Sequence, residues 1–399
     1  TEQCNQMEPV VRAIFTTTEY EGVNICSAEI PSIDITNRPC YYRGAGKTKG
    51  SYVRVGDADL PMTDYEIYSF ESYKAHVHDD ERPIDRANIS LLDEAGINNY
   101  ILQMKLNRPY FSKLSEEQIY ELLSITRNGV PTLASVLNFG IYPQGLLPQL
   151  AITATVIPGT EIGETTNDGV RFLDNKRIEG TLSEMLDEAI AFCNRNMRTQ
   201  TIIDPTTGKR TDKTEYPINA IREAILNALI HRDYSIHTEG TTIQISFFTN
   251  RLEIHSPGSL YGRMTVNDLG KARPDLRNPA LATMSEFLLK TENRYSGIPT
   301  IRREMKEHGL PEPLFENKRN EFVVTLFNKT ESPIDDIHDN TDLITFCKTP
   351  RTRQEISDYL DLKTVYFVTK KYIQPLVNQG KLKLLYPDKP KSKNQKYYS

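Results

Sequence analysis

The chain has 399 residues, of which 38% are hydrophobic and 25% are charged. This length predicts two to four domains, because single hydrophobic cores stop growing at roughly 250–300 residues. No stretch approaches the roughly 20 apolar residues that a membrane helix needs, so a membrane-spanning helix is excluded. Five scattered cysteines without CxxC spacing indicate neither a disulfide framework nor a zinc site, and we expect a cytoplasmic protein.

The formal net charge of −5 conceals an asymmetry along the chain. Residues 341–399 carry 12 Lys and Arg against 5 Asp and Glu, whereas residues 1–340 carry 36 against 48. Positive charge gathered on a terminal module indicates contact with nucleic acid there, and an acidic body repels phosphate backbone. A solvated lysine tail is the alternative.

The first elements in the sequence are short strands. Residues 23–31 alternate between apolar and polar types, and residues 50–56 (GSYVRVG) alternate again. The segment RGAGKTKG lies between them, but the phosphate-loop pattern GxxxxGK[ST] would need a glycine where Tyr41 stands. We therefore predict a glycine-rich hairpin at 43–50.

Helical and strand patterns then alternate, which predicts an α+β body. A helical region spans 79–128 and contains a capping box from Ser115 to Gln118. A strand follows within 150–159, and then a helix at 182–196. The polar stretch 204–217 (DPTTGKRTDKTEYP) is rich in turn formers and predicts a loop at a subdomain boundary.

The segment INAIREAILNALIHRDY, residues 218–234, predicts an amphipathic helix. Glu223, Asn227 and His231 stand four residues apart and therefore share one face. A carboxylate can act as a general base on water, and an amide oxygen can hold a hydrated Mg²⁺. An ordinary amphipathic helix explains the same spacing.

Downstream, residues 241–262 read as two strands joined at Thr249 and Asn250, followed by a glycine-bearing turn. Ser296 and Gly297 stand where another helix begins. The free N–H groups at the start of a helix can bind an anion.

These motifs resemble a known family. Glu223-x-x-x-Asn227-Ala228-x-x-His231 matches the N-box of GHKL ATPases, and five segments resemble the GHKL-like C-terminal region of RecG-like ATP-dependent helicases: HRDY at 231–234, IHSPGSL at 254–260, RNP at 277–279, SGI at 296–298 and GLPEP at 309–313. GSYVRVGDAD at 50–59 resembles the end of a Schlafen-type AlbA domain. Proteins of this kind are regarded as transcriptional regulators.

The resemblance implies roles for individual residues. Glu223 would be the general base and Asn227 a ligand of Mg²⁺, while a nucleotide would lie against Asn227, His231, Gly258, Ser296 and Gly297. The implied cofactors are ATP and Mg²⁺. Ser256 stands where GHKL enzymes carry the aspartate that binds adenine, so a nucleotide sensor and an ATP-hydrolysing enzyme both stay open.

The last 58 residues resemble a winged helix-turn-helix. Thr352 and Glu355 form a capping box for a first helix, and the second helix would end at Gly380. That helix would offer Lys363, Thr364, Tyr366, Thr369 and Lys370 to the major groove of DNA, and the wing would lay Lys389, Lys391 and Lys393 along phosphates. A winged helix that binds protein is the alternative.

We therefore predict a multidomain α+β protein with a GHKL-like α/β sandwich in the centre and a C-terminal winged helix. The expected parts are a truncated AlbA-like domain at 1–75, an α/β subdomain at 76–204, a GHKL-like ATP-binding-type domain at 205–330, a linker at 331–341 and the winged helix at 342–399. The predicted function is a DNA-binding transcriptional regulator with a nucleotide-sensing pocket. The expected partners are double-stranded DNA, a nucleotide and further copies of the chain in a homo-oligomer, with no membrane. An ATP-hydrolysing enzyme and a protein-interaction scaffold are the alternatives.

Overall fold

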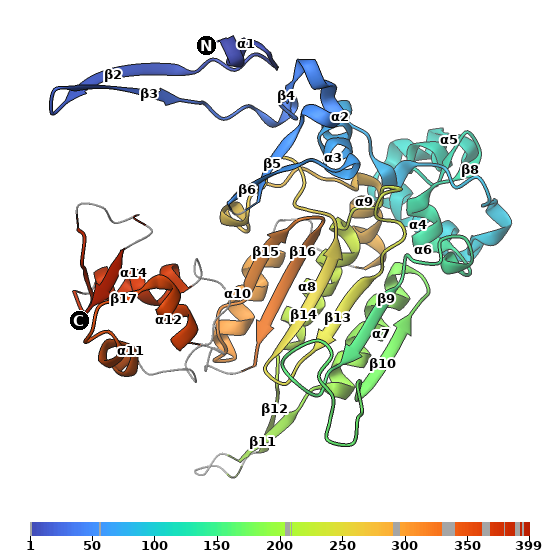
Figure 1. Ribbon diagram of the computed structural model, residues 1–399. Helices are drawn as coiled ribbons and strands as arrows, with labels where there is room; N and C mark the ends of the chain where they lie inside the picture. Colours follow the sequence, from blue (N-terminus) through green and yellow to red (C-terminus); the bar gives the residue numbers. More distant parts are fainter. Residues whose placement is uncertain are drawn as a thin grey trace. The chain divides into compact units, whose positions relative to one another are not determined.

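The fold mixes α-helices and β-strands (Figure 1). The computed structural model describes residues 2–55, 57–203, 208, 210–289, 296–328, 340–360, 368–378, 380–387, 392 and 395–399. It divides into two compact units, residues 1–328 and 329–399, and each is taken by itself. No helix among these residues is both long enough and apolar enough to cross a membrane.

A six-stranded sheet forms the centre of the first unit, with the strand order β10-β9-β13-β14-β16-β15. Its strands are β9 (Ile152–Val156), β10 (Asp174–Ile178), β13 (Ile243–Phe247), β14 (Arg251–Pro257), β15 (Leu314–Lys318) and β16 (Glu321–Phe327). The pairing of β9 with β13 is parallel, and the other pairs are antiparallel. The predicted strand at 150–159 and the predicted hairpin at 241–262 are confirmed.

Three helices cover one face of this sheet: α7 (Leu182–Asn196), α8 (Ile218–His231) and α10 (Gly297–Glu307), as Figure 1 shows. Leu252 and Ile254 alternate along β14 and turn their side chains into the same core as Ile221 and Ile225 of α8. Every second side chain of the strand and the side chains on one face of the helix therefore pack in the same apolar layer. The predicted helix at 182–196 is confirmed, with Thr181 as its cap.

Short elements precede the sheet. They are α1 (Glu2–Asn5), β1 (Met7–Glu8), the exposed hairpin of β2 (Ile14–Tyr20) and β3 (Val23–Glu29), β4 (Tyr41–Tyr42), α2 (Gly46–Gly50), β5 (Tyr52–Val55), β6 (Ala58–Pro61) and α3 (Asp64–Ala75). The hairpin predicted for 43–50 is wrong, because Gly46–Gly50 is a helical turn. A Cβ on Gly50 would lie 2.6 Å from the Tyr42 carbonyl oxygen, so the two backbone segments can approach this closely only because residue 50 has no side chain.

A helical region follows, as predicted. It contains α4 (Glu94–Asn107), α5 (Glu116–Leu122), the short pair β7 (Thr126–Arg127) and β8 (Val130–Pro131), α6 (Leu133–Phe139) and, much later in the chain, α9 (Pro279–Leu288). The Ser115 to Gln118 capping box is present at the start of α5.

The loop predicted for 204–217 is wrong in part. β11 (Thr199–Ile203) pairs with β12 (Arg210–Thr214), so residues 210–214 form a strand. The Thr201 hydroxyl donates to Asp212 at 2.7 Å across the two strands. Cross-strand pairs between polar side chains stabilise this ladder in a segment whose composition alone predicts a loop.

The second unit has a core of its own around Leu343, Ile356, Val368, Leu376 and Tyr397. Its elements are α11 (Asn340–Phe346), β17 (Arg351–Thr352), α12 (Arg353–Tyr359), a π-helical turn (Thr369–Ile373), α14 (Gln374–Asn378), β18 (Lys383–Leu384) and β19 (Lys396–Tyr398). The strand order is β17-β19-β18. The predicted capping box from Thr352 to Glu355 is confirmed.

A buried carboxyl group joins two distant parts of the first unit. Asp80 is fully buried, and its Oδ2 accepts the backbone N–H of Leu281 in α9 at 2.9 Å. Its Oδ1 has no hydrogen-bond partner among the described residues. Burial is the main cause that raises the pKa of Asp80 to about 7.

We therefore expect a specific pH dependence of stability. An unfolded aspartate loses its proton near pH 4, whereas folded Asp80 keeps it up to about pH 7. This carboxyl thus lowers the free energy of unfolding as pH rises between these values, by at most about 1.4 kcal/mol per pH unit. In urea titrations at pH 5, 6, 7 and 8, Asp80→Asn should flatten that slope, and the exposed control Asp85→Asn should not. Equal slopes in all three proteins would contradict this assignment.

Candidate functional site

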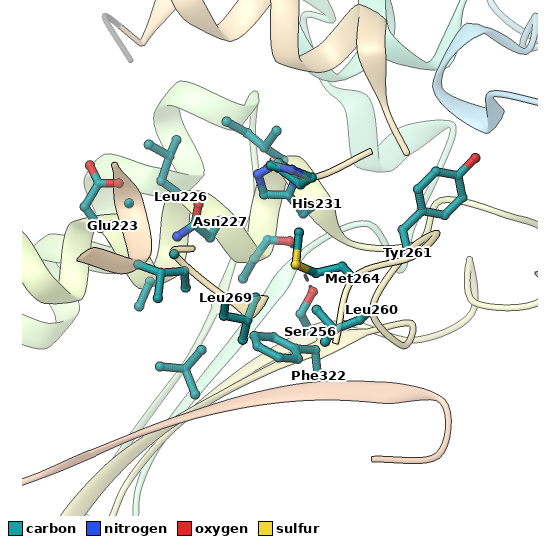
Figure 2. Close-up of a pocket in the computed structure, with 18 of the residues that line it drawn as sticks. Glu223, Leu226, Asn227, His231, Ser256, Leu260, Tyr261, Met264, Leu269 and Phe322 are labelled. Carbon is teal, nitrogen blue, oxygen red and sulfur yellow. Dashed lines mark hydrogen bonds between the residues drawn. The ribbon is translucent and has the colours of Figure 1, made fainter. Parts of the chain in front are cut away.

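A cavity of about 380 Å³ lies between α8, the sheet, the segment after β14 and the start of α10. Glu223, Asn227 and His231 of α8 all line it, as their spacing predicts (Figure 2). The rest of α8 packs into the core through its apolar residues. The polar face is thus the part of the helix that remains for a ligand.

The first residue of α10 lies directly against that polar face. A Cβ added to Gly297 would lie 3.0 Å from Asn227 Nδ2 and 3.1 Å from Glu223 Oε2. Ser296 is the N-cap residue of α10, and its side chain makes no capping hydrogen bond. The structure therefore brings together four residues that the sequence predicts for one site: Glu223, Asn227, Ser296 and Gly297.

The two polar side chains on α8 differ in how they are held. Glu223 Oε1 lies 3.4 Å from Nη1 of Arg222, whose Nη2 donates to the Leu289 carbonyl oxygen at 3.1 Å. Asn227 Nδ2 is buried and has no hydrogen-bond partner among the described residues. A buried amide without a partner costs free energy, so this group is poised to donate to a ligand.

His231 is the last residue of α8, and its side chain lines the cavity. The protein atoms around its ring and the nearby Arg277 guanidinium lower the pKa of His231 below its usual value, although the residue stays open to solvent. Its imidazole is therefore neutral at pH 7, and it can donate one hydrogen bond and accept another.

The sheet side of the cavity is mainly apolar. Ile254, Phe322 and Val324 line it from the sheet, and Leu260, Met264 and Leu269 line it from the segment after β14; Figure 2 labels Leu269 and Met264 above Phe322. Ser256 is the polar exception on the sheet side, and its hydroxyl donates to the Ala228 carbonyl oxygen at 3.3 Å. An apolar slot joined to a polar end suits a ligand with a flat apolar part and an anionic part.

Gly258 lines the cavity as predicted, and packing explains why it is glycine. Its φ is +103°, and a Cβ there would lie 2.4 Å from Asp233 Cβ and 2.6 Å from Arg277 Nη1. The left-handed φ and the close approach both require a residue without a side chain.

A buried ion pair behind Gly258 is not predicted from the sequence. Asp233 Oδ2 lies 3.6 Å from Arg277 Nη1, and both side chains are almost fully buried. Asp233 belongs to HRDY and Arg277 to RNP, segments that the analysis used only for the family resemblance. Charged side chains are seldom buried unless they are paired, so the burial of Asp233 and Arg277 would point to an ion pair. Their burial becomes visible only once the fold is known.

The predicted DNA-binding residues are not tested. Lys363, Thr364, Tyr366, Lys389, Lys391 and Lys393 lie outside the described residues. Thr369 begins the π-helical turn of the second unit, next to Lys370, whose side chain is also outside the description.

Comparisons with known proteins support part of this reading. Residues 240–326 match a family described as "Putative ATP-dependent DNA helicase recG C-terminal". Residues 341–398 match the C-terminal domain of Fic-like proteins, described as "Filamentation induced by cAMP". The first match includes Ser256, Gly258, Ser296 and Gly297 and begins after α8.

Among solved structures, the crystal structure of the DIP2311 protein from Corynebacterium diphtheriae is similar to this chain, with 18% identity and a TM-score of 0.47. The likeness covers 91% of this chain and 71% of that chain. No curated protein matches. The chain thus carries a region similar to RecG C-terminal domains and a second region similar to Fic-like C-terminal domains.

We expect Gly258→Ala to lower the free energy of unfolding by about 2–4 kcal/mol, because a positive φ and an overlap with Asp233 both oppose a methyl group. Gly309→Ala is the matched control, since Gly309 has a φ of +76° and no atom near its Cβ position. That variant should lose only about 1 kcal/mol. If chemical denaturation gave equal losses of unfolding free energy for the two variants, packing against Asp233 would not be the reason for a glycine at position 258.

Proposed function

We propose that the cavity beside α8 binds a nucleotide together with Mg²⁺, and that ATP is the nucleotide. The observation that carries this proposal is the position of Gly297 against Asn227 and Glu223. It supplies an anion-binding helix start, a metal-binding amide and a carboxylate at one end of an apolar slot. The similarity of residues 240–326 to an ATP-dependent family supports the same conclusion.

The start of α10 suits phosphate groups. The first N–H groups of a helix have no partner within the helix, and they carry partial positive charge. Gly297 has no side chain, so a phosphate can approach these groups closely. The unpartnered Nδ2 of Asn227 adds a further donor at the same place.

The residues present also fit a hydrated Mg²⁺. The described residues contain no cluster of three or more His, Cys, Asp or Glu side chains able to hold a metal. Mg²⁺ needs no such cluster, because it keeps several waters and binds through one or two protein oxygens plus substrate phosphates. Asn227 Oδ1 would supply the protein oxygen, and the bound ion would neutralise phosphate charge.

Glu223 gives the site a general base for hydrolysis. A carboxylate beside the phosphate end can orient and deprotonate an attacking water. Ser256 lines the sheet side of the apolar slot, where the family resemblance would place the aspartate that binds adenine. Selection of ATP over GTP should therefore be weak, which suits a sensor at least as well as an enzyme.

Asn227→Ala should weaken MgATP binding by tenfold or more in isothermal titration, because it removes the metal contact and the amide donor. Glu223→Gln should bind ATP nearly as the unmodified chain does, while any slow hydrolysis falls about a hundredfold. Asn99→Ala, at an exposed position on α4 outside the cavity, is the control and should change neither. Absence of heat with the unmodified chain would refute the nucleotide site.

We also propose that the second unit binds duplex DNA and that the whole chain is a transcriptional regulator. The charge on residues 341–399, with 12 basic against 5 acidic side chains, favours this role. The order of its described elements, α11-β17-α12, then the π-helical turn with α14, then β18-β19, around a separate core agrees with a winged helix.

In the full chain, replacing Lys389, Lys391 and Lys393 together with alanine should weaken binding to specific and random duplexes alike. The slope of log affinity against log salt should flatten by about two to three, because fewer counterions are released. Replacing Lys74, Lys105 and Lys113 of the first unit makes the same charge change and is the control. Equal effects of the two triple variants in fluorescence anisotropy would refute a DNA site on the second unit.

A further inference from the structure

Helix α3 contacts residues around the cavity, although the sequence predicts that this helix belongs to another domain. Its Tyr65 hydroxyl donates to Asp233 Oδ2 at 2.9 Å, and its Tyr73 hydroxyl donates to Asp275 Oδ2 at 2.9 Å. These pairs are 168 and 202 residues apart in sequence. Asp275 lines the cavity, and Asp233 pairs with Arg277, which also lines it.

Arg277 fixes the rim of the cavity, which is the segment 258–277. Its Nη2 donates to the Ser259 carbonyl oxygen at 2.8 Å, and its guanidinium lies over the Tyr261 ring at 5.0 Å. Both ends of the rim are therefore tied to one guanidinium. Tyr261 stands at the far end of the cavity from Glu223 (Figure 2).

Asp233 faces this guanidinium, and Tyr65 is one of the hydrogen-bond donors that stabilise its carboxylate. A buried carboxylate is stable only when its oxygens are paired and hydrogen bonded. Asp233 Oδ1 accepts the Ser235 N–H at 2.8 Å, and Oδ2 receives the Tyr65 hydroxyl and faces Arg277. Without the Tyr65 hydroxyl, Asp233 Oδ2 would lose its hydrogen bond at 2.9 Å and keep only the more distant Arg277 guanidinium at 3.6 Å. Arg277 would then have more freedom to shift.

Tyr73 secures the rim a second time. Its ring meets Tyr261 edge to face, with the ring centroids 5.3 Å apart and the planes at 77°. Gly262 lies against it, since a Cβ there would approach Tyr73 Cε2 at 2.9 Å and Asp275 Oδ2 at 2.5 Å. The rim thus packs on α3 through an aromatic pair, a hydrogen bond and a glycine.

We propose that Tyr65 and Tyr73 are positioning residues of the cavity: they hold the 258–277 rim, Arg277 included, in the geometry that accepts a nucleotide. This inference rests on the proposed nucleotide site. It makes α3 part of that site, although α3 contributes no residue to the cavity lining among the described residues. By thermodynamic linkage, a nucleotide that orders the rim also stabilises α3, so the region before it is coupled to ligand binding.

Tyr68 provides a matched control on the same helix. Its hydroxyl donates to Asp79 at 2.9 Å, and neither Tyr68 nor Asp79 lines the cavity. Tyr68→Phe removes the same atom as Tyr65→Phe and Tyr73→Phe from the same helix, but leaves the hydrogen bonds to Asp233 and Asp275 in place.

The first test is hydrogen exchange of the full chain without ligand. Tyr65→Phe and Tyr73→Phe should speed amide exchange within 258–277, and Tyr68→Phe should leave that segment unchanged. Unchanged exchange in the first two variants, or an equal rise in all three, would overturn the positioning role. This result does not depend on whether any nucleotide binds.

The second test is titration with MgATP. Tyr65→Phe and Tyr73→Phe should each raise Kd about three- to tenfold, as expected for the loss of a single hydrogen bond, and Tyr68→Phe should not. If Tyr65 acts through Arg277, its effect should largely vanish in an Arg277→Lys background, and full additivity in this double-mutant cycle would contradict the proposal. Absence of binding by the unmodified chain would refute the nucleotide site, and the exchange result alone would then decide whether α3 holds the rim.

Discussion

The close approach of α10 to α8 is the contact on which the site depends. Gly297 places the first turn of α10 against Asn227 and Glu223, at a distance that leaves no room for a larger residue without a shift. The N–H groups of a helix start, an unpartnered amide and a carboxylate consequently converge at one point. Separately, each of these features is common, and their convergence gives the cavity a polar end.

The rest of the first unit holds that convergence in place. The apolar residues of α8 join the core under the sheet, which leaves its polar face toward the cavity. The opposite end is closed by a buried charge pair, Asp233 with Arg277, whose partners reach α3 and the rim. Buried polar groups stabilise a protein only when each of them has a hydrogen-bond or charge partner. Tyr65 supplies one such partner for Asp233.

Local patterns predicted the elements better than the contacts between them. The capping boxes at Ser115 and Thr352 and the face shared by Glu223 and Asn227 follow from short-range spacing, and the structure has them. Composition misled at 43–50 and at 210–214, where a backbone contact and cross-strand pairs determine the conformation. The Asp233–Arg277 pair and its tyrosine were beyond prediction, because their partners are up to 168 residues away.

The most direct test of the account is a crystal structure of the unmodified chain grown with Mg²⁺ and a non-hydrolysable ATP analogue. The account predicts phosphate density at the start of α10, a metal beside Asn227 Oδ1 and the base in the slot above Ile254 and Phe322. A cavity without density at saturating analogue, or an ordered nucleotide bound elsewhere on the chain, would contradict it.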